Sequence, residues 1–278
     1  MFQDYPLNDV LIENCKGQVQ HVSLPILSRP HLEIGEREFY IDIRNTAKYF
    51  VEDGSKITVQ LYENTDDDSV MLFLNGSVLG AVLHQKKMLS FHGSAFCMNG
   101  KGILVCGSSG SGKSSVTAAF CQQEGATFIS DDITPITIED STVKLVPLKT
   151  KLKLWEDSLQ KLNIVRSKDI RRIRPTLEKY TIPYPNSSHE HQLDHLIVLG
   201  VHNQSAYQSF NIQGIEKYNI LRNQIYRKSF LNGMPETEKY YFKQLLAIAS
   251  NIKVTFILRP QICDIYGTAK FIKEKIDL

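Results

Sequence analysis

The chain has 278 residues, with 32 lysines and arginines against 30 aspartates and glutamates, so its formal net charge at pH 7 is only +2. This length predicts one large domain or two modest ones. The balanced charge gives no sign of nucleic acid or of an acidic membrane surface as a partner. The five cysteines are scattered singly without zinc-site spacing, as is typical of reduced thiols in a cytoplasmic protein. We expect no secretory signal and no membrane-spanning helix, because the N-terminus lacks an apolar core and the most apolar segment, residues 70–83, is too short.

Residues 1–65 are expected to form a small β-rich region. Apolar side chains occupy every second position in three stretches that are separated by turn residues, namely 31–34, 38–44 and 56–62. The region carries no catalytic cluster of its own, which favours a structural or substrate-docking role. Residues 66–278 are expected to form the main domain.

The main domain is predicted to open with a helix over residues 70–87, because Asp66 and its neighbours offer an N-cap and the last turn is basic. Residues 88–98 then alternate around His92-Gly93. We expect them to turn at Asn99-Gly100 into a buried strand over residues 103–106, forming a β-hairpin.

A glycine-rich loop follows that strand directly and matches the pattern G-x-x-x-x-G-K-[ST]. A helix over residues 116–123 is predicted after it. The glycines let backbone N–H groups approach a polyphosphate, and the helix N-terminus adds positive potential. The pattern predicts nucleotide binding, with Lys113 on the β- and γ-phosphates and Ser114 on Mg²⁺. The alternative is a flexible turn before an ordinary helix. The expected nucleotide-binding residues are Gly107, Ser108, Ser109, Gly110, Ser111, Gly112, Lys113, Ser114 and Ser115.

Two adjacent carboxylates, Asp131 and Asp132, follow a short predicted strand over residues 125–130. A carboxylate at the C-terminal end of a strand beside a phosphate-binding loop is suited to organise a metal or to act in catalysis. Asp131 could accept the proton of an attacking hydroxyl, with His92 orienting or tuning it. The alternatives are metal organisation only for the two aspartates and an ordinary core position for His92.

A basic segment extends from residue 149 to residue 179, with ten lysines and arginines against four acids. Arg171, Arg172 and Arg174 could clamp a phosphate or an acidic peptide, or could simply form a solvated face. Within the segment, residues 152–162 are predicted to be a helix, and Trp155 is expected in a core or an interface. His189 and His191 flank Glu190, but no third ligand is evident and we do not expect a metal there.

The remaining elements alternate irregularly between strand and helix. A hairpin is predicted over residues 134–138 and 143–146, further strands over 196–201 and 254–258, and helices over 218–231, 238–249 and 269–276. This order favours an α/β core with a mixed sheet.

Three pieces occur in a fixed order, His92-Gly93, the loop of residues 107–114 and Asp131-Asp132. Together they resemble the catalytic core of HPr kinase/phosphorylase and its relatives over about residues 89–154. The resemblance implies a P-loop kinase core of the HPr kinase/phosphoenolpyruvate-carboxykinase type that uses ATP and Mg²⁺, and it raises the possibility of a homo-oligomer. It also implies that Asp131 is the base toward a seryl hydroxyl, that Asp132 helps to arrange Mg²⁺, and that His92 contacts the base.

Ser115 stands where that family commonly has an acidic residue, and the downstream signature of the bifunctional enzymes is not recognisable. The chain is more similar to the shorter HPr-kinase-like proteins of peptide-maturation clusters, which include lasso-peptide kinases. The expected function is therefore ATP-dependent transfer of the γ-phosphoryl group to a serine hydroxyl of a peptide or small protein, such as a precursor peptide. The alternatives are a small-molecule hydroxyl kinase and a non-catalytic nucleotide-binding regulator.

Overall fold

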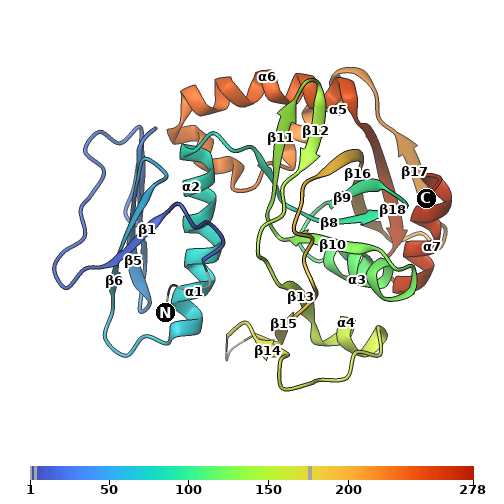
Figure 1. The fold of residues 1–278 in the computed structure, drawn as a ribbon, viewed down its shortest axis with the longest axis horizontal. Helices are drawn as coiled ribbons and strands as arrows, with labels where there is room; N and C mark the ends of the chain where they lie inside the picture. Colours follow the sequence, from blue (N-terminus) through green and yellow to red (C-terminus); the bar gives the residue numbers. More distant parts are fainter. Residues whose placement is uncertain (1, 3–4, 175–176) are drawn as a thin grey trace. The chain divides into compact units, whose positions relative to one another are not determined.

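A computed structural model describes residues 2, 5–174 and 177–278, and it divides into two compact units (Figure 1). The first unit contains residues 1–89 and 226–244, and the second contains residues 90–225 and 245–278. The first unit is therefore larger than the β-rich region that we expected over residues 1–65. None of the helices in the described residues is long and apolar enough to cross a membrane.

The first unit contains a six-stranded sheet in the order β1-β6-β5-β4-β3-β2, in which only the β1–β6 pair is parallel. The three strands expected from alternation are present as β3, β4 and β6. Its strands are β1 (Leu11–Asn14), β2 (Leu27–Arg29), β3 (Leu32–Ile34), β4 (Glu38–Ile43), β5 (Ala47–Glu52) and β6 (Lys56–Leu61).

The helical segment after the sheet begins at Asp67, three residues before the predicted start at residue 70. The predicted N-cap is confirmed, because the Asp66 side chain accepts a hydrogen bond from the Ser69 N–H at 2.8 Å. It runs through α1 (Asp67–Phe73), a π-type turn, η2 (Leu74–Val78), and α2 (Leu79–Gln85). This segment is bonded to the six-stranded sheet: Tyr49 donates to the Val70 carbonyl at 3.0 Å, and Gln85 accepts from the Gly54 N–H at 2.6 Å. These bonds explain why the first unit extends to residue 89.

The helix predicted over residues 218–231 is shorter than expected. Helix α5 (Gly214–Asn223) ends early, and Arg227 adopts a left-handed conformation with φ of 50° before the 3₁₀ turn η3 (Lys228–Gly233). A left-handed residue cannot continue an α-helix, so the backbone breaks there. Helix α6 (Pro235–Asn251) follows.

The second unit is built on a nine-stranded mixed sheet, as the order of elements predicted. Strands β9, β16 and β18 are parallel to one another, whereas β8, β10 and β17 are antiparallel to their neighbours. Its strands are β7 (Ser90–Phe91), β8 (Gly93–Met98), β9 (Lys101–Cys106), β10 (Thr127–Asp131), β11 (Thr134–Glu139), β12 (Thr142–Leu145), β16 (His191–His202), β17 (Gln208–Asn211) and β18 (Lys253–Pro260).

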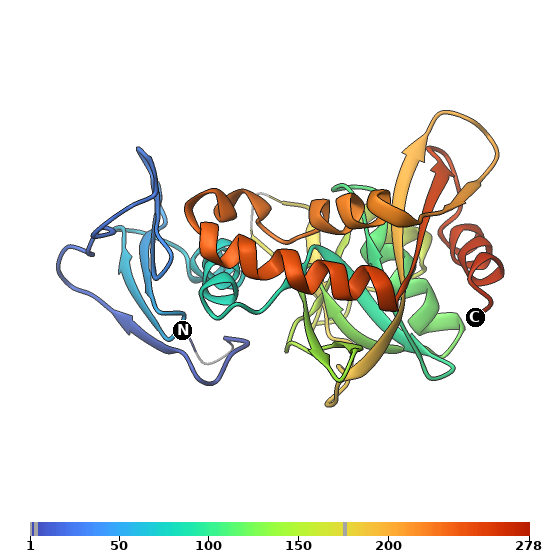
Figure 2. The ribbon, with the colours of Figure 1, turned by 90° about the horizontal axis from the view of Figure 1, so that it is seen from above.

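Two helices, α3 (Lys113–Gln123) and α7 (Ile265–Lys275), pack on the large sheet. Phe96 of β8 stacks on Phe120 of α3 with a centroid distance of 4.5 Å, and Ile272 of α7 joins the same apolar cluster. Figure 2 shows α3 and α7 on the side of the strands away from α5. Burial of this apolar surface fixes α3, and hence the loop that precedes it, against the sheet.

A separate three-stranded sheet in the order β13-β15-β14 lies below the large sheet in the view of Figure 1. It consists of β13 (Leu152–Trp155), β14 (Arg171–Arg172) and β15 (Lys179–Ile182), with α4 (Glu156–Lys161) following β13. The prediction of a helix over residues 152–162 was wrong in its first half. Leu152 and Leu154 are buried while Lys153 and Trp155 are not, which is the period of a strand.

Candidate active site

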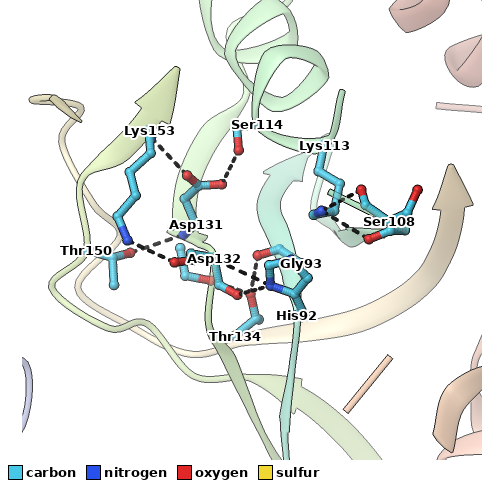
Figure 3. Close-up of polar contacts among 12 residues, drawn as sticks. His92, Gly93, Ser108, Lys113, Ser114, Asp131, Asp132, Thr134, Thr150 and Lys153 are labelled. Atoms are coloured by element: carbon cyan, nitrogen blue, oxygen red, sulfur yellow. Dashed lines mark hydrogen bonds and ion pairs between the residues drawn. The ribbon is translucent and has the colours of Figure 1, made fainter. Parts of the chain in front are cut away.

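Strand register brings the three sequence pieces to one edge of the large sheet. Gly93 pairs with Cys106 across β8 and β9, and Ser94 pairs with Asp131 across β8 and β10. The end of β9, the end of β10 and the residue before β8 therefore lie side by side. His92, the glycine-rich loop of residues 107–112 and the two aspartates converge there because the sheet aligns them (Figure 3).

The glycine-rich loop lies between β9 and α3, as predicted, and glycine is required at its first position. Gly107 has φ of 137°, and a Cβ atom there would meet the Leu199 carbonyl oxygen at 2.2 Å. Inside the loop, the Lys113 ammonium donates to the carbonyls of Gly107 and Ser108 at 3.0 and 3.1 Å. The lysine thus lies under the loop, with its charge at the N-terminus of α3.

Asp131 is almost fully buried, and both of its carboxylate oxygens accept hydrogen bonds. The Ser114 hydroxyl donates to Oδ1 at 2.8 Å, and the Lys153 backbone N–H donates to Oδ2 at 2.9 Å. The backbone N–H of Asp131 donates to the Thr150 hydroxyl at 3.1 Å. Burial, with the neighbouring charge of Asp132, raises the pKa of the Asp131 carboxyl above its ordinary value.

Asp132 is partly exposed and sits among cations. It has a left-handed backbone with φ of 74°, and its Oδ2 accepts from the Lys153 ammonium at 2.9 Å. Its Oδ1 lies 3.4 Å from His92 Nδ1, and its carbonyl oxygen lies 3.0 Å from the same nitrogen. Burial raises the pKa of the Asp132 carboxyl, but the Lys153 charge and hydrogen bond outweigh that effect and leave the pKa below its ordinary value.

The other two charged groups of the site have shifted pKa values as well. Burial, and next the Lys113 charge, lower the pKa of His92, so its imidazole is neutral at pH 7. Burial also lowers the pKa of the Lys113 ammonium, although the nearby acids oppose the shift.

These groups line one cavity of about 400 Å³ in the second unit. His92, Lys113, Ser114, Asp131 and Asp132 all contribute to its wall, so the structure brings the predicted catalytic and metal-binding residues together. The predicted nucleotide-binding residues in the wall are Ser109, Gly110, Gly112, Lys113, Ser114 and Ser115. Ser115 donates to the Ser158 hydroxyl at 3.0 Å, which ties α3 to α4.

The wall also contains cations that the sequence did not single out. Arg259, at the end of β18, donates from Nε to the Ser111 carbonyl at 2.7 Å and from Nη2 to the Gly110 carbonyl at 3.3 Å. Lys153 and Lys179 come from the small sheet. The basic composition of residues 149–179 signalled the two lysines in general terms, but nothing in the local sequence of Arg259 does so. Its partners are about 150 residues away, and only the β16–β18 pairing brings them close.

Arg171, Arg172 and Arg174 do not line the cavity. Arg172 donates to the Tyr180 hydroxyl at 3.0 Å and contacts Glu178 at 3.4 Å. Trp155 was expected in a core or an interface. It lines the cavity and is 43% exposed, which excludes a core position and leaves the interface untested. The described residues contain no cluster of three or more histidine, cysteine or acidic side chains that could hold a metal ion.

The side chains of the site include the groups that a magnesium-bound polyphosphate requires as ligands. Mg²⁺ prefers one or two carboxylates together with phosphate oxygens, and here a hydroxyl, Ser114, and the carboxylates of Asp131 and Asp132 line one wall. The buried Ser111 hydroxyl in the loop has no hydrogen-bond partner within the described residues.

The fold and the site together define a mixed α/β protein with a glycine-rich loop, a lysine and two carboxylates at one sheet edge. No protein-family model matches the chain, and a search of curated proteins finds no match either. Among solved structures, it is similar to the HPr(Ser) kinase/phosphatase from Coxiella burnetii, with 12% identity, a TM-score of 0.32, and coverage of 68% of this chain and 88% of that one. At this TM-score, the similarity by itself assigns neither an activity nor a substrate.

Proposed function

We propose that the protein is an ATP-dependent kinase that transfers the γ-phosphoryl group to a serine hydroxyl of a peptide or small protein, such as a ribosomal precursor peptide. The observation that carries this proposal is that Lys113, Ser114, Asp131 and Asp132 line a single cavity. Phosphoryl transfer needs phosphate positioning, metal binding and a group that accepts the hydroxyl proton. The cavity supplies a residue for each requirement.

The loop and Lys113 would hold the phosphates. Lys113 is the first residue of α3, and its ammonium donates to the carbonyls of Gly107 and Ser108 in the loop before the helix. A phosphate beside the loop would gain both this charge and the N-terminal N–H groups of the helix. When bound, Mg²⁺ would neutralise charge that develops on the transferring phosphate. Ser114 and Asp132 are the residues that we expect to hold it.

The two aspartates are suited to different roles. Asp132 stays ionised over a wide pH range, since its pKa is lowered, and a permanent carboxylate suits metal binding. Asp131 has a raised pKa and therefore holds a proton more readily, which suits a base toward the acceptor hydroxyl. Its hydrogen bond from Ser114 places it beside the proposed metal position as well. A phosphoryl group and an acceptor hydroxyl could both reach it from the cavity.

The test is an incubation of the purified chain with ATP, Mg²⁺ and serine-containing peptides, followed by mass spectrometry. The expected result is a phosphate mass gain on serine that is abolished by a chelator and by Asp131→Asn. Failure to phosphorylate any peptide, protein or small hydroxyl compound would disprove the kinase assignment. Phosphorylation of free serine alone would replace the peptide acceptor with a small molecule.

A further inference from the structure

One face of the small sheet is cationic and continues from the candidate active site. Residues opposite one another in an antiparallel pair point to the same side. On one side, Lys153 pairs with Thr181, Trp155 pairs with Lys179, and Arg171 also pairs with Thr181. We call Lys153, Trp155, Arg171, Lys179 and Thr181 the cationic face.

The opposite side of the small sheet is buried at β13 and β15, whereas Arg172 on that side of β14 is exposed. The buried side chains belong to the apolar cluster beneath the large sheet, and they are Leu152, Leu154, Tyr180 and Ile182. This burial fixes which side of the sheet is outward. The cationic face is therefore held outward by packing.

Three of the four acids of the basic segment pair with cations that are not on the cationic face. Glu156 pairs with Arg166, and the guanidinium carbon of Arg166 lies 4.5 Å from the centroid of the Tyr180 ring. Glu178 pairs with Arg172 at 3.4 Å. A further acid, Asp157, pairs with Lys161, also at 3.4 Å. None of the five residues on the cationic face is acidic. Because Lys153 pairs with Asp132, the net positive charge of the face comes from Lys179 and Arg171.

The cationic face begins at the candidate catalytic carboxylates. Lys153 lies 2.9 Å from Asp132, and Lys153, Trp155 and Lys179 all line the cavity. Arg171, which is exposed, extends the face beyond the cavity. An extended peptide lying on this face would bring one of its hydroxyl groups toward Asp131.

Trp155 adds an apolar surface to the cations. It is 43% exposed, and the Lys179 ammonium lies 5.7 Å from its ring centroid. An exposed tryptophan beside cations suits a peptide that offers carboxylates next to apolar side chains. Nucleic acid is a poorer match, because the whole chain has a net charge of only +2 and few cations lie on this face.

We propose that the cationic face is the docking surface for an acidic segment of the acceptor, next to the serine that receives the phosphoryl group. The identity of the ligand as an acceptor rests on the proposed kinase function, whereas the binding itself does not. Lys179 and Arg171 would contact carboxylates of the acceptor, and Trp155 would pack against an apolar side chain.

The experiment compares two labelled serine peptides of equal length, one with glutamates beside the serine and one with glutamines in their place. Binding is measured by fluorescence anisotropy in the presence of Mg²⁺ and a non-hydrolysable ATP analogue. We expect the glutamate peptide to bind about tenfold more tightly, as a few partly exposed ion pairs allow. Trp155 is the only tryptophan, so its emission should also change when that peptide binds.

Variants locate the peptide on the surface. Arg171→Gln and Trp155→Phe should each weaken binding of the glutamate peptide about threefold. Arg171 lies outside the cavity wall, so Arg171→Gln should leave the KM for ATP unchanged. Lys179→Gln should also weaken binding of the glutamate peptide about threefold. The matched control is Lys270→Gln on α7, because Lys270 is exposed and lies outside the cavity wall. This control should leave peptide binding unchanged. Melting temperatures close to that of the wild type would show that the variants fold.

Equal binding of the two peptides would overturn the proposal, and so would full binding by all three variants of the cationic face. Tighter binding of a short oligonucleotide of equal charge at the same residues would also overturn it, and would assign the face to nucleic acid. Equal phosphorylation of both peptides would leave the kinase function intact and remove the docking surface. Selective binding of the glutamate peptide without any phosphoryl transfer would support the docking surface and count against the kinase function.

Discussion

Each of the two units buries a titratable side chain to the same extent. His84 in the first unit and Asp131 in the second are both only 2% exposed. Burial lowers the pKa of His84 to about 4, and burial raises the pKa of Asp131. In both cases burial disfavours the charged form of the side chain. Judged by burial and pKa shift alone, the two residues would be equally good candidates for a functional site.

Their surroundings separate them. Both nitrogens of His84 have partners inside the first unit, the Tyr226 carbonyl at 3.0 Å and the Tyr241 hydroxyl at 3.3 Å. Asp131 instead lines a cavity and bonds Ser114, a residue suited to metal binding. A buried titratable group thus indicates a site only when a ligand can reach it. His84 is a structural residue, and Asp131 is a candidate catalytic one.

The sharpest test of this contrast is Asp131→Asn, which should lower kcat by about a thousandfold, since general bases contribute on that scale. Binding of ATP should persist, because the loop and Lys113 are untouched. The asparagine can keep both hydrogen bonds by accepting from the Lys153 N–H and donating to Ser114. A single-turnover assay with a separate nucleotide-binding measurement would check both expectations.

The same variant has an expected effect on stability. The raised pKa of Asp131 means that the folded state binds its proton more tightly than the unfolded state does. The associated stability is present below the ordinary pKa and is lost as the pH rises through the folded pKa. At pH 7 the buried charge therefore opposes folding, and Asp131→Asn should keep or raise the melting temperature. A large drop in melting temperature would place Asp131 with His84 as a structural group.

Lys113→Ala should come next, with a loss of about a hundredfold in kcat/KM because a charge on the transferring phosphates is removed. Unlike Asp131→Asn, it should also weaken nucleotide binding. Calorimetric titration with an ATP analogue measures this difference. Unchanged binding would show that the ammonium remains on the carbonyls of Gly107 and Ser108 in the complex.

The candidate site was largely predictable from sequence because its main residues belong to short local patterns. A strand, a glycine-rich loop and a helix fix Lys113 and Ser114, and an acid pair after the next strand fixes Asp131 and Asp132. The cations that complete the wall were not predictable in this way. Lys153 and Lys179 depend on which side of a three-stranded sheet faces the cavity, and Arg259 depends on a parallel pairing between distant strands.

The fold, like the site, was predictable where local sequence patterns decide it and not where distant contacts do. Alternating strands such as β4 and β6 were predicted, but β5 has three consecutive buried residues, Tyr49 to Val51, and gives no alternation. Spacing of Leu152, Trp155 and Leu159 suggested a helix, although Leu152 and Trp155 belong to a strand. The sequence predicted a basic last turn for the helix over residues 70–87. It gave no sign that His84 in that turn is buried, because the burial follows from contacts with residues more than 140 positions away.

The next prediction concerns His84. Its folded pKa of about 4 lies below the ordinary value of 6.5, so the unfolded chain binds more protons between these pH values. The stability is complete above pH 6.5 and falls as the pH decreases toward 4. At pH 5 the loss should be about 2 kcal/mol. Amide hydrogen exchange in α2 at pH 7 and pH 5 measures it. His84→Gln should remove this pH dependence while turnover per folded molecule stays normal.

The smallest effect is expected for His92→Gln, about a tenfold loss of kcat with the KM for ATP unchanged. His92 Nδ1 lies near both the carbonyl and the carboxylate of Asp132, whose backbone is left-handed. Loss of the imidazole should let Asp132 shift away from the metal position, so the Mg²⁺ concentration that gives half-maximal rate should rise. A merely structural histidine would lower the melting temperature and leave that Mg²⁺ concentration unchanged. The Mg²⁺ dependence of the rate therefore decides whether His92 acts with the Asp131 site or resembles His84.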